Sequence, residues 1–208
     1  MTNNEIFFEP GQHKEAGFTY NPFKALVAPR PIGWISSQSA DGIANLGAYS
    51  YFNALSDLPA MIMFSSAPDA REGRDGHKDT LSNIEQTGEF AVNICNAPLL
   101  SAMVKSSAAV APEVDEFALA GLTKKQGRFI SAPYIAEAPA ALECTLFKTI
   151  PLPGNGDKPG CTMVIGRVVG IHIDGAFVDE GLVDGEKLQQ VARLGYKYYS
   201  TVHDIFEA

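Results

Sequence analysis

A loop rich in charged residues is the first part of the sequence that could bind an anion. It reads REGRDGHKDT, and its cations are Arg71, Arg74 and Lys78. Asp79 or Thr80 can begin a helix, and the backbone N–H groups at a helix N-terminus attract anions. A lysine and a hydroxyl beside those N–H groups would complete a phosphate pocket. The same loop holds three acidic residues, so a solvated, self-paired surface loop is the alternative.

A predicted β-hairpin over residues 32–53 contains the second set of groups that could bind a ligand. The stretch IGWISSQS (32–39) is typical of a strand, and Asp41-Gly42 follows it between apolar residues. An Asp-Gly pair in that setting predicts a two-residue hairpin turn, with the return strand over 44–53.

Polar and aromatic side chains are mixed along this hairpin. The first strand carries Ser36, Ser37 and Gln38, and the return strand carries Asn45, Tyr49, Ser50, Tyr51, Phe52 and Asn53. Successive side chains of a strand point to opposite faces, so Ser50 and Phe52 share one face. Tyr49, Tyr51 and Asn53 share the other face. Such a mixture suits a planar, hydrogen-bonding heterocycle, and an ordinary strand pair with one solvent-exposed face is the alternative.

The rest of the sequence offers weaker signals for a functional site. The C-terminal segment RLGYKYYST (193–201) could close a pocket or a dimer seam with its arginine and tyrosines, and surface packing is the alternative. The adjacent carboxylates Asp115 and Glu116 are typical of a solvated face. The sequence has no GxGxxG between a strand and a helix, no P-loop and no nucleophile elbow. Its four histidines are scattered and it has no CxxC pair, so we expect no metal site.

Composition narrows the class of protein. The chain has 208 residues, of which 46% are hydrophobic and 19% are charged, and its net charge is −8. A negative field repels phosphate backbones, so we expect no nucleic-acid binding. The N-terminal MTNNEIFFEP lacks the features of a secretory signal, and no apolar run reaches the ~20 residues of a membrane helix. Three widely spaced cysteines, Cys95, Cys144 and Cys161, indicate buried free thiols in a reducing cytoplasm.

The hydrophobic pattern predicts one mainly β domain with inserted short helices. Further strands are expected over 60–67, 89–95, 141–150 and 161–173, and helices over 80–88, 99–109, 112–122 and 185–193. Strands that follow one another through hairpins favour an antiparallel barrel over a parallel sheet. We therefore expect a single domain over residues 1–208, preceded by an N-terminal arm over residues 1–20.

Several motifs in one order resemble a known family. PRPIGWISSQSADGIANLGAYSYFN (29–53) and KDTLSNIEQTGEFAVNI (78–94) resemble the flavin reductase-like, FMN-binding split-barrel family, in the branch of flavoredoxin and the nitrilotriacetate monooxygenase reductase component. VDEFALAGLT, APAALECTL, VIGRVVGIHID and the ARLG ending follow in the family's order. The resemblance covers about residues 20–201. It implies a six-stranded, split antiparallel barrel, Greek-key-like, that binds FMN near a homodimer interface.

The resemblance also implies roles for individual residues. The Ser36-Ser37-Gln38 strand and the Lys78-Asp79-Thr80 helix start resemble the FMN phosphate and ribityl contacts, with Arg71 and Arg74 as further phosphate candidates. Asn45 and the run Ser50-Tyr51-Phe52-Asn53 resemble the stretch beside the isoalloxazine ring. Arg193 resembles a C-terminal residue that approaches the site. Tyr196 stands where many relatives have a second glycine.

The implied activity is transfer of a hydride from NADH or NADPH to FMN, with no catalytic residue of the protein because the cofactor carries the chemistry. A monooxygenase component could receive the reduced flavin. The alternative is a non-catalytic FMN-binding electron-transfer protein, as flavoredoxin is, because both functions need the same pocket.

Overall fold

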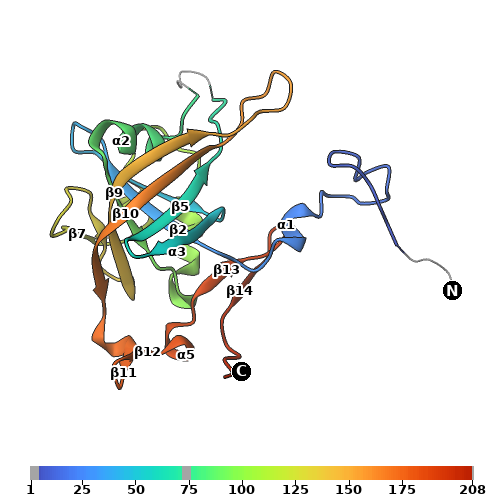
Figure 1. Ribbon diagram of the computed structural model, residues 1–208. Helices are drawn as coiled ribbons and strands as arrows, with labels where there is room; N and C mark the ends of the chain where they lie inside the picture. The colour runs from blue at the N-terminus through green and yellow to red at the C-terminus, as the bar shows by residue number, and fades with distance from the viewer. Residues whose placement is uncertain (1–4, 72–75, 208) are drawn as a thin grey trace.

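The computed structural model describes residues 5–71 and 76–207, and antiparallel strands dominate it (Figure 1). Seven strands form one sheet in the order β3-β2-β6-β9-β10-β5-β4, and every pair in it is antiparallel. Their bounds are β2 (Gly33–Gln38), β3 (Ala44–Tyr49), β4 (Phe52–Asp57), β5 (Ala60–Ser66), β6 (Glu89–Asn93), β9 (Ala140–Pro151) and β10 (Thr162–Ile173). The expected mainly β, antiparallel architecture with short helices is confirmed, but the sheet has seven strands where the resemblance implied six.

The sheet curls into a barrel that is split between its two edge strands. Within the described ranges, β3 and β4 do not pair with each other, although the chain passes directly from one to the other through Ser50 and Tyr51. The expected return strand over 44–53 is therefore two strands, since β3 ends at Tyr49.

The β2–β3 hairpin has the expected pairing and a longer turn than expected. Gly33 lies opposite Tyr49, and Gln38 lies opposite Ala44. Five residues separate the strands, and the Gly42 N–H donates to the Ser39 carbonyl at 3.0 Å. The prediction of a two-residue turn is wrong, although Gly42 does adopt the left-handed backbone, at φ +85°, that favours glycine.

Both faces of β2 are buried, which excludes the interpretation of this hairpin as a strand pair with one wet face. Ile35 lies inside the barrel in a cluster with Phe64 and Phe90. Trp34 faces the other way, into a second cluster that includes Met103, and its indole N–H donates to the Ser106 hydroxyl at 2.9 Å.

Three helices cover these two clusters. Leu81 and Ile84 of α2 (Asp79–Thr87) belong to the barrel cluster, so α2 packs against the inside of the barrel. It ends at Gly88, with φ +74°, as expected. The second cluster includes residues of α3 (Leu100–Ser106) and α4 (Glu116–Ala120). These helices are shorter than the expected 99–109 and 112–122, and α3 follows the short 3₁₀ helix η1 (Ala97–Leu99).

A small sheet lies beside the barrel, between it and the N-terminal segment (Figure 1). It has the order β1-β13-β14, with β1 (Arg30–Pro31), β13 (Val191–Arg193) and β14 (Tyr199–Thr201). The expected helix over 185–193 is wrong beyond its first turn. Only α5 (Gly185–Leu188) is helical, Gln189 has φ +46°, and the next residues pair as β13. Pairing with β1, far away in sequence, overrides the local helical pattern.

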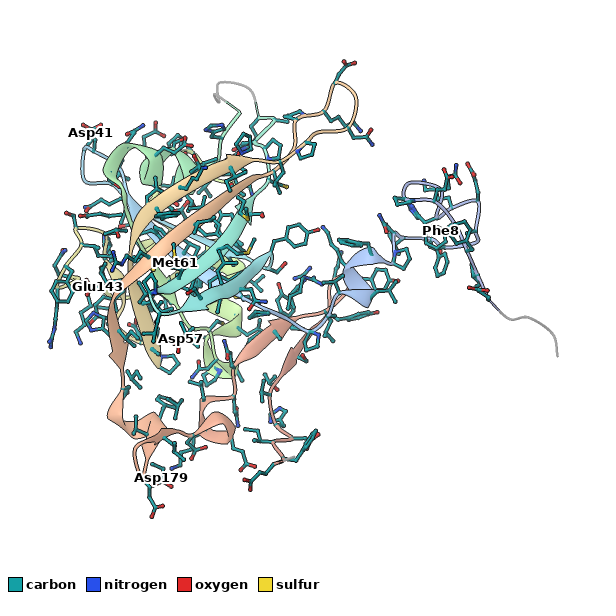
Figure 2. The ribbon with its side chains drawn as sticks, viewed as in Figure 1. Phe8, Asp41, Asp57, Met61, Glu143 and Asp179 are labelled. Carbon is teal, nitrogen blue, oxygen red and sulfur yellow. The ribbon has the colours of Figure 1, made fainter. Side chains whose placement is uncertain are left out.

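The remaining elements are short. They are α1 (Phe23–Leu26), β7 (Lys124–Lys125), β8 (Tyr134–Ile135), η2 (Gly175–Phe177), β11 (Val178–Asp179) and β12 (Leu182–Val183). The segment that precedes α1 extends away from the barrel, and Phe8 marks its position in Figure 2. Within the described ranges, no helix is long and apolar enough to cross a membrane. The three cysteines are free, and Cys161 is half-buried where we expected it to be buried.

A buried carboxylate attaches the loop between β7 and β8 to the barrel. Glu143 of β9 has no exposed surface and lies at the side of the barrel where β7 also lies (Figures 1 and 2). Its carboxylate accepts hydrogen bonds from the backbone N–H groups of Arg128, at 2.7 Å, and Phe129, at 2.6 Å, and from Nε2 of His172 at 2.5 Å. Burial alone would raise the pKa of Glu143, but these donors hold it below its usual value.

We expect Glu143→Gln to lower the free energy of unfolding by about 3 kcal/mol at pH 7, because the new amide N–H₂ would face donors. The pKa of Glu143 is lower in the folded protein than in the unfolded chain. The ionised carboxylate therefore stabilises the fold at pH values above the unfolded-state pKa, and this contribution is lost as the pH falls. The difference between wild type and variant should therefore shrink below about pH 4.3. Urea unfolding at several pH values measures this, with the exposed Glu113→Gln as the control. A difference that does not vary with pH would contradict the assignment.

Candidate functional site

A cavity of about 290 Å³ opens beside β3, where three helices approach that strand. The wall comes from β3, from the start of α2, from the end of α3 and from the start of α4. Its side chains include Asn45, Tyr49, Arg71, Lys78, Asp79, Thr80 and Glu116. The charged loop and the hairpin, which the sequence marked separately, therefore meet at one cavity. We call it the first cavity.

The start of α2 brings a cation to the wall of the first cavity. Lys78 is the N-cap residue of α2, and its side chain makes no capping hydrogen bond. Its ammonium lies 5.6 Å from the centroid of the Tyr49 ring. A helix start carries a partial positive charge, so the ammonium and the helix end would act on an anion in the same sense.

Arg71, in contrast, already binds other groups of the protein. Its guanidinium makes an ion pair with Asp69, with Nη2 2.5 Å from Oδ2, and its Nη1 donates to the Val110 carbonyl at 2.8 Å. The hydrogen bonds that Arg71 donates to Asp69 raise the pKa of the guanidinium further. Arg74 lies outside the described residues. Of the two described cations at this cavity, Lys78 is the one without an ion pair in the described part of the chain.

The Asn45 amide connects the strand to two helices. Its Oδ1 accepts from the Thr80 hydroxyl at 2.7 Å, and its Nδ2 donates to Glu116 Oε1 at 3.0 Å. The other oxygen of Glu116 accepts from the Leu46 N–H at 3.2 Å. The Ser37 hydroxyl joins the same network at 3.3 Å from Asn45 Oδ1. We call these four side chains, together with their bonds, the Asn45 network.

Glu116 is a site residue that the sequence reasoning missed. The interpretation of Asp115 and Glu116 as a solvated face is wrong for Glu116, which is only 6% exposed. Burial raises the pKa of its carboxyl group. Asp115 instead caps α4 by accepting from Phe117 N–H, and it pairs with Lys124 at 2.5 Å. Local sequence gives no signal that separates the two carboxylates, because the burial of Glu116 comes from β3.

A second cavity, of about 250 Å³, adjoins the first along β3. Ala48, Tyr49 and Ser107 line both cavities. Burial raises the pKa of Tyr49 to about 12, so its hydroxyl stays protonated at neutral pH. The two cavities therefore lie next to each other along β3, and we call the two together the groove.

Residues of α1, of β1 and of the C-terminal segment line the far end of this groove. The second cavity is also lined by Lys24, Arg30, Ser50, Arg193, Tyr196 and Tyr199. Tyr196 has φ +60°, in the left-handed region of the backbone that favours glycine.

The groove brings together seven of the residues that the resemblance assigns to FMN binding. Asn45, Arg71, Lys78, Asp79 and Thr80 line the first cavity, and Ser50 and Arg193 line the second. Whether they contact a cofactor stays a prediction.

Six of the other predicted residues do not line either cavity; they are Ser36, Ser37, Gln38, Tyr51, Phe52 and Asn53. The three residues of β2 make their hydrogen bonds to other groups of the protein. The Ser36 hydroxyl donates to the Pro133 carbonyl at 2.6 Å, and Gln38 Nε2 donates to the Gly42 carbonyl at 2.8 Å. Ser37 is fully buried and reaches the site only through the Asn45 network.

The other three residues lie after the end of β3. The ring of Tyr51 lies 5.7 Å from the Lys24 ammonium. Phe52 packs against the barrel cluster, and Asn53 accepts from the next backbone N–H, that of Ala54. The break between β3 and β4 turns these side chains away from the positions that an unbroken strand would have given them.

Comparisons with known proteins place this architecture in a family. Residues 26–191 match the family described as "Flavin reductase like domain". An uncharacterized protein of Aquifex aeolicus is 37% identical over 183 residues, which cover 86% of this chain and 88% of that protein.

Similar solved structures share this fold. Nitrilotriacetate monooxygenase component B from Bacillus cereus is 31% identical, with a TM-score of 0.89 and full coverage of both chains. An FMN-binding domain of a flavin reductase-like enzyme from Shewanella baltica shares the fold at 20% identity, with a TM-score of 0.66 and coverage of 91% and 95%. The expected fold, the split barrel of FMN-binding flavin reductases, is confirmed. The chain belongs to the flavin reductase-like domain family.

Proposed function

We propose that this protein binds FMN in the groove and passes a hydride to it from NADH or NADPH. The observation that carries the proposal is the groove itself, which joins a cationic helix start to a wall formed by Ala48 and Tyr49. Such a site offers separate places for a phosphate and for a ring. Membership of the flavin reductase-like family, and the FMN-binding domain among the structural neighbours, support the same ligand.

The residues of the first cavity fit a phosphate and a sugar-like chain. Gly47 lies in its wall, and a Cβ there would stand 3.3 Å from both the Thr80 hydroxyl and the Tyr49 ring. The missing side chain therefore keeps the wall open between α2 and β3. Lys78 would hold the phosphate together with the backbone N–H groups at the start of α2. The Thr80 hydroxyl already donates to Asn45, so we assign it to positioning.

Bound FMN would supply the hydride-accepting ring, and the protein would supply its position and charge balance. Lys78 neutralises the phosphate. The Asn45 network keeps β3 at a fixed distance from α2, which fixes the ring wall relative to the phosphate end. Tyr49 stays neutral and offers a hydroxyl in the wall without taking part in proton transfer. No acid–base residue of the protein is required, because the cofactor would carry the chemistry.

The competing function is a non-catalytic FMN protein that shuttles electrons. A carrier should keep its flavin through dialysis, whereas a reductase that uses FMN as a diffusing substrate should lose it. The groove is compatible with both, so the donor reaction decides between them.

We expect the protein, mixed with FMN under anaerobic conditions, to bleach the flavin absorbance near 450 nm when NADH or NADPH is added. The two donors are added in separate cuvettes so that the preference is read directly. A rate no higher than that of free FMN with either donor would contradict the reductase proposal. Retention of FMN through dialysis together with that result would favour the electron-transfer alternative.

We expect Lys78→Gln to weaken FMN binding about tenfold, or about 1.4 kcal/mol, because it removes the unpaired cation at the helix start. Riboflavin, which lacks the phosphate, should bind wild type and variant equally. Fluorescence quenching of each flavin measures both affinities. The matched control is Lys105→Gln, an exposed lysine of α3 that does not line the groove. Equal FMN affinity in wild type and Lys78→Gln would remove this lysine from the site.

We also propose a homodimer and a partner oxygenase. The Bacillus cereus relative is named as a component of a monooxygenase, which supports a monooxygenase that receives reduced flavin. Large apolar side chains are exposed on three strands of the barrel, as at Leu55, Phe147 and Ile171, and on the N-terminal segment, as at Phe7. A second copy that covers such surface would remove it from water.

The free cysteines support a reducing, cytoplasmic location, and we treat residues 1–208 as a single FMN-binding domain.

Sedimentation equilibrium tests the dimer. We expect a mass of twice 22.3 kDa at micromolar concentration. We expect Ile171→Lys, which places a charge on the exposed apolar surface of β10, to shift the protein toward monomer. A wild-type mass equal to that of one chain would contradict the homodimer.

A further inference from the structure

The second cavity contains a buried arginine that no carboxylate neutralises. Arg30 of β1 is only 6% exposed. Its Nη1 donates to the carbonyls of Lys24 and Val27, and its Nη2 donates to the Leu194 carbonyl at 3.0 Å. Its Nε is buried and has no hydrogen-bond partner. Within residues 5–71 and 76–207, Arg30 makes no ion pair. A buried charge without a counter-ion is costly, so it points to a ligand of opposite charge.

A second arginine lies directly opposite the first. Arg30 of β1 pairs with Arg193 of β13 in an antiparallel register, and opposite residues share a face of the sheet. Like charges in that position destabilise the pairing. Arg193 donates from Nη2 to the Tyr196 carbonyl at 2.7 Å, and its guanidinium lies 4.4 Å from the centroid of the Tyr199 ring. These contacts orient the guanidinium and leave its charge uncompensated in the described part of the chain.

The lining of the second cavity has one sign of charge. Lys24 joins the two arginines there, and among the described lining residues there is no aspartate or glutamate. Hydroxyl groups of two serines and three tyrosines complete the polar lining. The first cavity differs, because Asp69, Asp79 and Glu116 line it alongside its cations. The strongest local excess of positive charge in the groove is therefore at the end away from α2.

We propose that Lys24, Arg30 and Arg193 form a second anion subsite, which binds a phosphate ester or pyrophosphate group of a nucleotide. Guanidinium groups present paired N–H donors that match phosphate oxygens, and an anion between Arg30 and Arg193 would relieve their repulsion. The proposal rests on the proposed function in one respect: the nucleotide is then either the nicotinamide donor, through its pyrophosphate, or the flavin, through its own phosphate.

Inorganic pyrophosphate is the probe that tests the subsite without any flavin. We expect isothermal titration of the full-length protein to show a pyrophosphate site that survives Lys78→Gln and weakens at least tenfold in Arg193→Gln and in Lys24→Gln. Arg128→Gln is the matched control, because this exposed arginine lies outside the groove. Thermal unfolding of each variant checks that it is folded. Arg30 is left intact in this test, since its bonds to three carbonyls also support the small sheet.

Two outcomes would overturn the subsite. One is the absence of pyrophosphate binding to wild type in the millimolar range, which is also the result expected if a carboxylate of a second copy neutralises the arginines. The other is an unchanged affinity in Arg193→Gln.

Nucleotide titrations then separate the two sources of phosphate. A rise of at least tenfold in the KM for NADH or NADPH in Arg193→Gln, with an unchanged Kd for FMN, assigns the subsite to the nicotinamide donor. A rise in the Kd for FMN, with riboflavin binding unchanged, assigns it to the flavin phosphate and contradicts the placement of that phosphate at the start of α2. Failure of wild type to oxidise NAD(P)H would contradict the proposed function and would leave the pyrophosphate result to decide the subsite by itself.

Discussion

The hydrogen bonds of the Asn45 amide are the constraint on which the candidate site depends. One side of the amide accepts from Thr80 in α2, and the other donates to Glu116 in α4. The two helices come from different parts of the chain, and each packs on a different core cluster. A single amide on β3 therefore sets the distance between a helix start that can bind an anion and the strand that forms the wall of the groove. Because the network is buried, each of its groups needs its partner.

The distribution of charge along the groove adds a second constraint. The protein has a net charge of −8, so any phosphate must be bound by local cations against an unfavourable overall field. At the α2 end, Lys78 and the helix start provide this in the presence of three carboxylates. At the other end, two arginines and a lysine lie together, and the described lining residues include no carboxylate. A groove with cations at both ends suits ligands with more than one phosphate, or two ligands that meet between the ends.

Local sequence predicted the parts of the fold that local chemistry determines. Gly88 ends α2, and the apolar run at 60–67 forms β5, because a left-handed cap and a bounded apolar run need no distant partner. The prediction of a helix over 185–193 was wrong because Val191–Arg193 pairs with β1 as a strand.

The residues of the candidate site also differ in whether local sequence could predict them. Lys78 and Thr80 could be predicted, since a lysine and a hydroxyl at a helix start are a local pattern. The burial of Glu116 and of Arg30 could not, because each depends on a contact between segments far apart in sequence. Ser36 and Ser37 have the residue types of a binding strand, but both faces of β2 are buried. The Ser36 hydroxyl donates to the Pro133 carbonyl on one face, and the Ser37 hydroxyl bonds to Asn45 on the other.

The central claim is that the groove along β3 holds FMN with its phosphate at the start of α2. A crystal structure of the protein grown with FMN tests it most directly. We expect phosphate oxygens within hydrogen-bonding distance of the Lys78 ammonium and the α2 backbone N–H groups, with the ring against Ala48 and Tyr49. A flavin bound outside this groove, or a phosphate at the Arg30–Arg193 end with the α2 end empty, would contradict it.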